Sequence, residues 1–325
     1  MFKEPTVLVL GAGASVPYGY PTGAELIEKV KSLGSDYNRF DIAQALKETP
    51  PLSIDNFLSI NPSLASDGKF LIARVLLGMN TTGNSIPRNE NDWYSILHHA
   101  LSAPSVADVQ GVVDNAKNLT IISFNYENSL EYHLFSRLLK TERFKDSACE
   151  IMNNIKIIHV YGSLFSIPED FQEYKNNQVL RAHFLESGFF PISDKNHFLP
   201  YEDERYLDRF ANTVSSNIKT IHDDRSRNQD AVDKLKAASK IYILGYGFDH
   251  TNNERIGLDS ALASVTGTGN YGAAKTIYYT NYQNLQPKID LLMPKAYGVG
   301  NTAHRRIHKS EKSVFDALNN HFPFP

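Results

Sequence analysis

Residues 7–23 read VLVLGAGASVPYGYPTG and contain the pattern that decides the fold. The apolar run from Val7 to Leu10 shows no alternation, which is typical of a strand buried on both faces. It continues directly into GAGAS at residues 11–15, a tight turn of small residues. A buried strand followed by a tight glycine turn predicts a parallel sheet covered by helices.

The GAGAS turn matches only part of the dinucleotide-binding pattern G-x-G-x-x-G. We expect Gly11 and Gly13 to let the backbone approach a pyrophosphate, whose charge is met by free N–H groups at a helix N-terminus. Val16 replaces the third glycine, and the polar segment 32–39 stands where a dehydrogenase has its second strand and ribose-binding acid. A dehydrogenase is therefore disfavoured, and a glycine turn without any ligand stays open.

The composition limits the possible function classes. The 325 residues are 42% hydrophobic and 21% charged, which is ordinary for a globular protein with a sizeable core. A net charge of −3 offers no surplus of Lys and Arg for phosphates, so we expect no direct nucleic-acid binding. The single cysteine, Cys149, excludes an internal disulfide and a cysteine-based zinc cage. Without a secretion signal or a membrane-length apolar run, we expect a cytoplasmic protein with no membrane contact.

Alternating strands and helices predict an α/β fold with a Rossmann-like doubly wound parallel sheet. The expected strands are 7–10, 119–124, 155–160, 241–244 and 276–280. The expected helices are 24–33, 41–47, 54–60, 69–79, 93–101, 128–139, 205–221, 231–238, 254–264 and 310–321. No Gly-, Ser- or Pro-rich linker divides the chain, so we expect one domain, 1–325, with helical insertions at about 24–117 and 163–240.

Small or polar side chains follow all five expected strands. The segments are GAGAS at 11–15, SFNYENSLE at 123–131, HVYGSL at 159–164, GYGFD at 245–249 and TNY at 280–282. Because open α/β sheets bind ligands beyond the carboxyl ends of their strands, five such ends together predict one ligand-sized site. His159 and Tyr161 are two residues apart and are expected to face the same side of their strand.

The combination of GAGAS, the turn at Pro21, SFNYE, HVYGS and the late G-Y-G resembles the sirtuin-like fold. It is more similar to the sirtuin-like NAD hydrolases of bacterial antiphage defence than to the protein deacylases. The resemblance implies an NAD⁺ glycohydrolase that releases nicotinamide and ADP-ribose, with NAD as substrate, no metal, and a role in abortive infection through NAD⁺ depletion. It also implies a homo-oligomer or a partner such as a HerA-type translocase ATPase, an Argonaute-like protein or a phage sensor.

The resemblance also assigns roles to residues. Asn125 is implied to orient the ribose or the attacking water, and His159 to accept the proton. The residues implied to contact NAD are Gly11, Ala12, Gly13 and Ser15 at the pyrophosphate and adjoining ribose, Pro21 and Thr22 over the nicotinamide, Gly245, Tyr246, Gly247 and Asn281 at the adenosine, and Phe124, Tyr161 and Gly162 within the same motifs. Taken singly, an N-capping asparagine and a core histidine explain Asn125 and His159 equally well.

The sequence departs from the family pattern at two points. Tyr161 stands where the deacylases have the catalytic histidine directly before glycine, so Tyr161 remains an alternative for placing a water or a ribose hydroxyl. The two C-x-x-C pairs of the deacylases are missing, which favours water over acyl-lysine as the acceptor. An ADP-ribosyl transferase or deacylase stays open, as does a sensor or scaffold that binds NAD or ADP-ribose without turnover.

Other polar residues have ordinary structural explanations. Asp55 lies at an expected helix start, where capping accounts for it. Glu127 and Glu131 share a helix face at i, i+4. They could approach the site, although solvated or helix-dipole roles are more usual. The basic run 304–309 is expected to be a solvated approach to a helix. Surface positions are expected for the scattered histidines His98, His99, His183 and His197.

Overall fold

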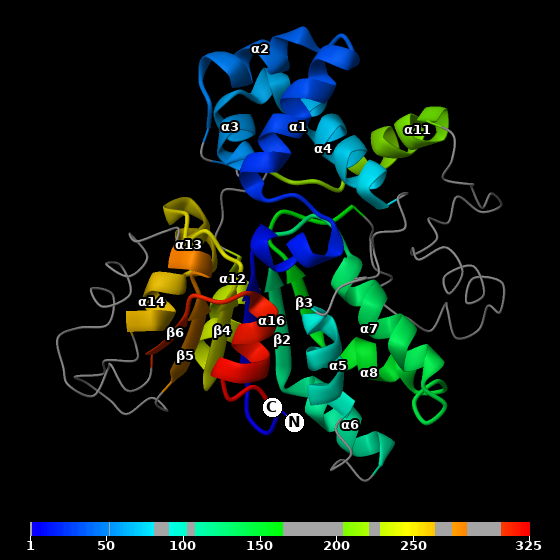
Figure 1. The fold of residues 1–325 in the computed structure, drawn as a ribbon, viewed down its shortest axis with the longest axis vertical. Helices are drawn as coiled ribbons and strands as arrows, with labels where there is room; N and C mark the ends of the chain where they lie inside the picture. The colour runs from blue at the N-terminus through cyan, green and yellow to red at the C-terminus, as the bar shows by residue number, and fades with distance from the viewer. Residues whose placement is uncertain are drawn as a thin grey trace.

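The computed structural model describes residues 2–51, 53–80, 91–102, 108–164, 204–220, 228–263, 275–284 and 307–325. Within these ranges the chain forms a six-stranded, all-parallel sheet flanked by helices (Figure 1), which confirms the expected α/β, Rossmann-like class. The strands are β1 (Thr6–Leu10), β2 (Leu119–Ser123), β3 (Lys156–His159), β4 (Lys240–Leu244), β5 (Thr276–Thr280) and β6 (Ile307–Ser310).

The strand order is β3-β2-β1-β4-β5-β6, with β1 at the centre. Leu8 of β1 pairs with Ile121 of β2 on one side and with Tyr242 of β4 on the other. Every residue of β1 is buried, which explains its unbroken apolar sequence. Because the strand order reverses between β1 and β4, their carboxyl ends form the switch point at which open α/β sheets bind ligands.

Helices beside the sheet fall into two sets (Figure 1). On the side of β1 to β3 lie α5 (Trp93–Ser102), α6 (Val109–Lys117), α7 (Ser129–Lys140) and α8 (Ala148–Asn154). On the side of β4 to β6 lie α12 (Gln229–Ala237), α13 (His250–Ile256) and α14 (Leu258–Ala263). The short helix α16 (Val314–Asp316) and a following turn of π-helix, Ala317–His321, pack near α5.

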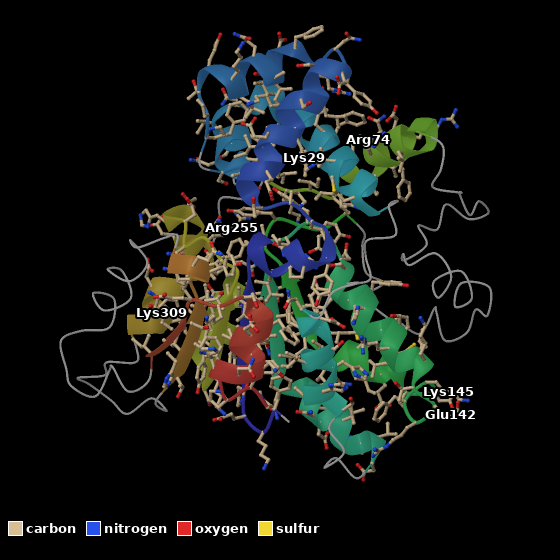
Figure 2. The ribbon with its side chains drawn as sticks, in the orientation of Figure 1. Lys29, Arg74, Glu142, Lys145, Arg255 and Lys309 are labelled. Atoms are coloured by element: carbon tan, nitrogen blue, oxygen red, sulfur yellow. The ribbon has the colours of Figure 1, made fainter. Side chains whose placement is uncertain are left out.

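A helical layer lies beyond the carboxyl ends of the strands, at the top of Figure 1. It consists of α1 (Gly23–Asp36), α2 (Phe40–Glu48), α3 (Ile54–Ile60), α4 (Ala65–Asn80) and α11 (Glu204–Ser215). Arg74 of α4, labelled in Figure 2, forms an ion pair of 2.8 Å with Asp208 of α11. Both long helical intervals therefore contribute to one layer, whereas α5 and α6 of the first interval pack beside α7 and α8.

The structure differs from the expected elements at several points. The end of the basic run forms the strand β6 and not an approach to a helix, because residues 307–310 pair with β5. The helix expected over 254–264 is divided at Gly257, whose φ of 63° ends α13. The helix expected over 205–221 ends at Ser215, and its last expected residue lies outside the described ranges. The helices α6 and α8 were not expected. Among the described residues, no helix has the length and apolar character needed to cross a membrane.

Candidate functional site

The turns after β1 and β4 pack directly against each other at the switch point. The N–H groups of Gly11 and Gly13 donate to the carbonyl oxygens of Leu244 and Gly245 at 3.1 and 3.0 Å. A Cβ added to Gly11 would lie 2.5 Å from the oxygen of Gly245, and one on Gly13 would lie 2.9 Å from it. Gly245 itself has a φ of 57°, where L side chains are strained. The three glycines are therefore needed for the close approach of these two turns.

The GAGAS turn continues into a 3-10 helix, η1 (Ala12–Ala14), and not into an α-helix. The N–H of Ala14 donates to the oxygen of Gly11 at 2.9 Å, and the N–H of Ser15 donates to the oxygen of Ala12 at 3.0 Å. Together with the donors described above, these N–H groups are engaged within the fold. The N–H groups of Gly11, Gly13, Ala14 and Ser15 are therefore not free to face a pyrophosphate, and contact of this turn with a ligand remains a prediction.

Asn125 lies just after β2 and faces the GAGAS turn. Its side-chain Nδ2 donates to Ser15 Oγ at 2.8 Å and to the oxygen of Gly11 at 3.2 Å. Asn125 is not the N-cap of α7, because that position belongs to Asn128. The structure thus brings Asn125 and Ser15, two of the residues predicted for the site, into direct contact across β1 and β2.

His159 is the last residue of β3, and both of its ring nitrogens have close neighbours. Its Nδ1 lies 2.9 Å from the backbone oxygen of Asn125, and its Nε2 lies 2.5 Å from Oε1 of Glu131. The side chain of Glu131 is only 2% exposed. Burial by itself lowers the pKa of His159, but the Glu131 carboxylate and the Asn125 oxygen outweigh burial and raise that pKa above its ordinary value.

Glu127, like Glu131, is hydrogen-bonded to a predicted site residue. The Ser15 hydroxyl donates to its Oε1 at 2.5 Å, and the N–H of Ser129 donates to its Oε2 at 2.6 Å. Burial raises the pKa of Glu127. Tyr20 is buried nearby, and the pKa of its phenol is raised by burial first and then by Glu127 and Glu131. Both glutamates are buried beside Ser15 and His159, so a solvated role is wrong, and the alternative, an approach to the predicted site residues, agrees with the structure. We call Ser15, Asn125, Glu127, Glu131 and His159 the charged network.

The two-residue spacing of His159 and Tyr161 predicted that their side chains face the same side of one strand. In the structure they contact different helices. β3 ends at His159, and Gly162, with a φ of 71°, completes the turn that follows. The Tyr161 hydroxyl donates to Oδ1 of Asn252 in α13. The guanidinium carbon of Arg255, labelled in Figure 2, lies 4.9 Å from the centre of the Tyr161 ring. Tyr161 therefore belongs to the β4 side of the site, whereas His159 contacts α7.

Aromatic rings from the segments that follow β2, β3 and β4 come together near the switch point. The ring centre of Phe124 lies 4.9 Å from that of Tyr246 and 5.9 Å from that of Tyr161. Phe248 follows Tyr246 at 5.2 Å between ring centres. The hydroxyl of Tyr246 donates to Oδ1 of Asn253 at 2.9 Å. We call Phe124, Tyr161, Tyr246 and Phe248 the aromatic group; three of its four members are predicted site residues.

The remaining predicted residues surround these two groups. Pro21 is buried, and Thr22 caps the N-terminus of α1. Gly247 is exposed just after β4. Asn281 is buried at the end of β5, where its N–H donates to the oxygen of Ser310, and β4 separates it from β1.

Sequence reasoning offered Glu127 and Glu131 only as residues that could approach the site, missed Tyr20, and misjudged Asp55. The N-cap of α3 is Ser53, whereas Asp55 is half-buried and accepts a hydrogen bond from the Tyr126 hydroxyl. Burial raises the pKa of Asp55 to about 6. The available signal was the placement of both glutamates within the segment 123–131, directly beside Asn125.

One histidine expected at the surface is also buried. His98 in α5 is 8% exposed, and both of its ring nitrogens are buried without a hydrogen-bond partner among the described residues. Burial lowers the pKa of His98 to about 4, so its ring is neutral at physiological pH. His99 is exposed as expected, whereas His183 and His197 lie outside the described residues. Within the described ranges, no group of three or more His, Cys, Asp or Glu is arranged to hold a metal ion.

In comparisons with known proteins, no family model matches this chain and no curated protein matches it. The strand order defines the class as a Rossmann-like α/β protein, and its function has to be argued from the site.

Proposed function

We propose that this protein is a sirtuin-like NAD⁺ glycohydrolase, which converts NAD⁺ and water to nicotinamide and ADP-ribose. The observation that carries the proposal is the charged network buried at the ends of β1, β2 and β3, beside the switch point of the sheet. Buried charged groups cost free energy unless they are paired, so a folded chain seldom holds several of them together away from a functional site.

The network suits the chemistry of nicotinamide release. Nicotinamide leaves C1′ of the ribose as a neutral molecule, and positive charge develops on the sugar as in glycoside hydrolysis. Glu127 and Glu131 place carboxyl groups in a buried environment, where the negative charge of an ionised carboxylate interacts strongly with a developing cation. The Asn125 amide is oriented by Ser15 and by the oxygen of Gly11, which suits a group that places a ribose hydroxyl or a water.

The proposal places the two ends of NAD⁺ on the two sides of the switch point. The nicotinamide ribose lies at the charged network, below the segment that contains Pro21 and Thr22. The pyrophosphate lies at the GAGAS turn with Ala12 and Gly13, which are half-buried. The adenosine lies over Gly245, Tyr246 and Gly247, towards Asn281, where the aromatic group offers ring faces for stacking. Water is the acceptor, and the reaction as proposed uses no metal.

In the cell, the proposed role is depletion of cytoplasmic NAD⁺ during phage infection. Such an activity has to be restrained in uninfected cells. The proposed control is assembly into a homo-oligomer, or a separate partner such as a HerA-type translocase ATPase, an Argonaute-like protein or a phage sensor.

The test is incubation of the purified protein with NAD⁺, followed by chromatography of nicotinamide and ADP-ribose. We expect both products in equal amounts from the wild type and from Asn320→Ala, which changes an exposed asparagine far from the charged network in sequence. Asn125→Ala should abolish both products. NAD⁺ that binds tightly and stays intact would favour a sensor, and transfer of ADP-ribose to a protein or other acceptor would favour a transferase.

A further inference from the structure

Both ring nitrogens of His159 face groups that accept hydrogen bonds. The backbone oxygen of Asn125 has no proton to give, so Nδ1 at 2.9 Å has to carry one. Nε2 lies 2.5 Å from Glu131 Oε1, and an ionised carboxylate likewise only accepts. The Asn128 amide is farther from Nε2, at 3.5 Å, and donates to Glu131 at 3.3 Å. This arrangement describes an imidazolium paired with a carboxylate, and the raised pKa of His159 agrees with it. An imidazolium has no lone pair and cannot accept a proton.

The hydrogen bonds around Ser15 run in one direction. The Asn125 Nδ2 group can only donate, so Ser15 Oγ accepts from it at 2.8 Å. The Ser15 hydroxyl therefore points its own proton at Glu127 Oε1, 2.5 Å away. The second oxygen of Glu127 accepts from the backbone N–H of Ser129 at 2.6 Å, which fixes the carboxylate. The Tyr94 hydroxyl, which pairs with Ser129 Oγ at 2.8 Å, is a further hydrogen-bond partner of Ser15. The proposal below requires the second lone pair of Ser15 Oγ to face a bound water instead.

We propose that Ser15 is a catalytic residue that takes the proton of the attacking water and passes its own proton to Glu127, while His159 is a positioning residue for Asn125. This inference rests on the proposed NAD⁺ hydrolysis. The water oxygen forms a bond to C1′ as the bond from C1′ to the nicotinamide nitrogen breaks, and the electron pair of that bond goes to nicotinamide. One water proton goes to Ser15, the Ser15 proton goes to Glu127, and the other water proton stays on the new hydroxyl of ADP-ribose. Glu127 then releases its proton to solvent.

The proposal makes a definite prediction for the pH dependence of kcat. The titratable groups that face Glu127 are Tyr20 from the segment before α1, Tyr94 from α5, Glu131 from α7 and His159 from β3. Burial first, and Glu131 with it, raises the pKa of Glu127. Only ionised Glu127 accepts a proton, so kcat should rise with pH through this raised pKa and then level off.

The first test does not depend on turnover. Long-range ¹H–¹⁵N NMR of histidine-labelled protein reports the protonation of each ring nitrogen, and the His159 signals are those that disappear in His159→Gln. We expect both nitrogens of His159 to carry protons at about pH 7.5, above the ordinary histidine pKa, and Glu131→Gln to lower the pKa of His159. A neutral His159 at that pH would overturn the proposal.

The second test compares pH profiles of NAD⁺ hydrolysis for several variants. We expect Ser15→Ala and Glu127→Gln to lower kcat about 10²-fold or more with a small change in KM, as for loss of general-base catalysis. Glu127→Gln should also lose the acidic limb of the profile, Glu127→Asp should recover that limb, and His159→Gln should keep it despite a lower kcat. Glu150→Gln, which changes an exposed carboxylate in α8, is the matched control and should keep the wild-type profile. Thermal unfolding of each variant separates misfolding from lost catalysis.

An acidic limb that persists in Glu127→Gln and vanishes in His159→Gln would overturn the assignment while leaving the proposed hydrolysis intact. A wild-type protein that never releases nicotinamide would instead contradict the proposed function, and the NMR measurement would still decide the protonation of His159.

Discussion

The charged network and the aromatic group, which meet at the switch point, are built from opposite kinds of side chain. In the charged network Glu131 pairs with His159 and Glu127 pairs with Ser15. In the aromatic group the ring of Tyr246 lies between those of Phe124 and Phe248. The backbone is similar on both sides, a parallel strand that ends in a small-residue turn. The proposed function assigns the chemistry to the charged network and the binding surface to the aromatic group.

Energetics supports this division. A buried charge costs several kcal/mol when it loses its partner, so a charged network is kept only where every member is satisfied. Aromatic contacts contribute about 0.5–1.5 kcal/mol for each pair beyond area burial, and they tolerate small changes. Substitutions in the charged network should therefore act mainly on kcat, and substitutions in the aromatic group mainly on KM.

The largest expected effect comes from Asn125→Asp. The new carboxylate cannot donate to Ser15 or to the oxygen of Gly11, and it adds negative charge beside Glu127. We expect kcat for NAD⁺ hydrolysis to fall about 10²- to 10⁴-fold, as when a positioned catalytic group is lost. Initial rates at saturating NAD⁺ check this. A normal kcat for Asn125→Asp would show that Asn125 has no role in catalysis.

Gly245→Ala should break the contact between the two sides. The new Cβ would lie 2.1 Å from the backbone nitrogen of Ala14, at a φ of 57° that already disfavours L residues. We expect the free energy of unfolding to fall by about 3 kcal/mol, from backbone strain and steric overlap together. Gly23→Ala is the control, because its Cβ meets nothing within 4 Å. Urea unfolding of both variants checks the difference, and equal stabilities would contradict the packing of the two turns.

Asp55 joins the helical layer to the loop after β2 and should give a pH-dependent stability. Burial raises the pKa of Asp55 from 3.8 to about 6. As the pH rises between these values, Asp55 ionises in the unfolded chain but stays protonated in the folded state, so the folded state loses stability. A shift of this size corresponds to about 3 kcal/mol. Asp55→Asn should therefore gain stability relative to the wild type as the pH rises from 4 to 7. Denaturant unfolding at both pH values checks this. The exposed Asp41→Asn serves as control and should show no such gain.

The smallest effect is expected from Tyr246→Phe in the aromatic group. The change removes one hydrogen bond of 2.9 Å to Asn253 and keeps the ring. A hydrogen bond contributes about 1 kcal/mol, so we expect KM for NAD⁺ to rise about fivefold with a smaller change in kcat. Steady-state kinetics measures whether the change falls on KM or on kcat. A loss mainly in kcat would contradict the division between chemistry and binding.

Much of the fold could be predicted because local patterns specify it. The apolar run of β1 and the polar residues after each strand locate five strands and the edge that carries the site. β6 was missed because its residues are IHKS, an edge strand with polar side chains and an exposed centre. The short helices α6 and α8 were also missed, since seven to nine residues give little periodicity.

The pairings within the site could not be predicted from spacing. Ser15 meets Glu127 across 112 residues of sequence, and His159 meets Glu131 across 28. A glutamate near a helix start usually faces solvent, and only tertiary packing against β1 and β3 buries these two. Likewise, alternation along β3 placed Tyr161 with His159, but the strand ends at His159 and the turn sends Tyr161 towards α13.

The most direct test of the division is a crystal structure of the Asn125→Ala variant with NAD⁺ bound. We expect the nicotinamide ribose to lie beside Ser15 and Glu127, with the adenine over Tyr246. An adenine beside Glu127, or a nicotinamide ring at Tyr246, would show that the charged network does not perform the chemistry.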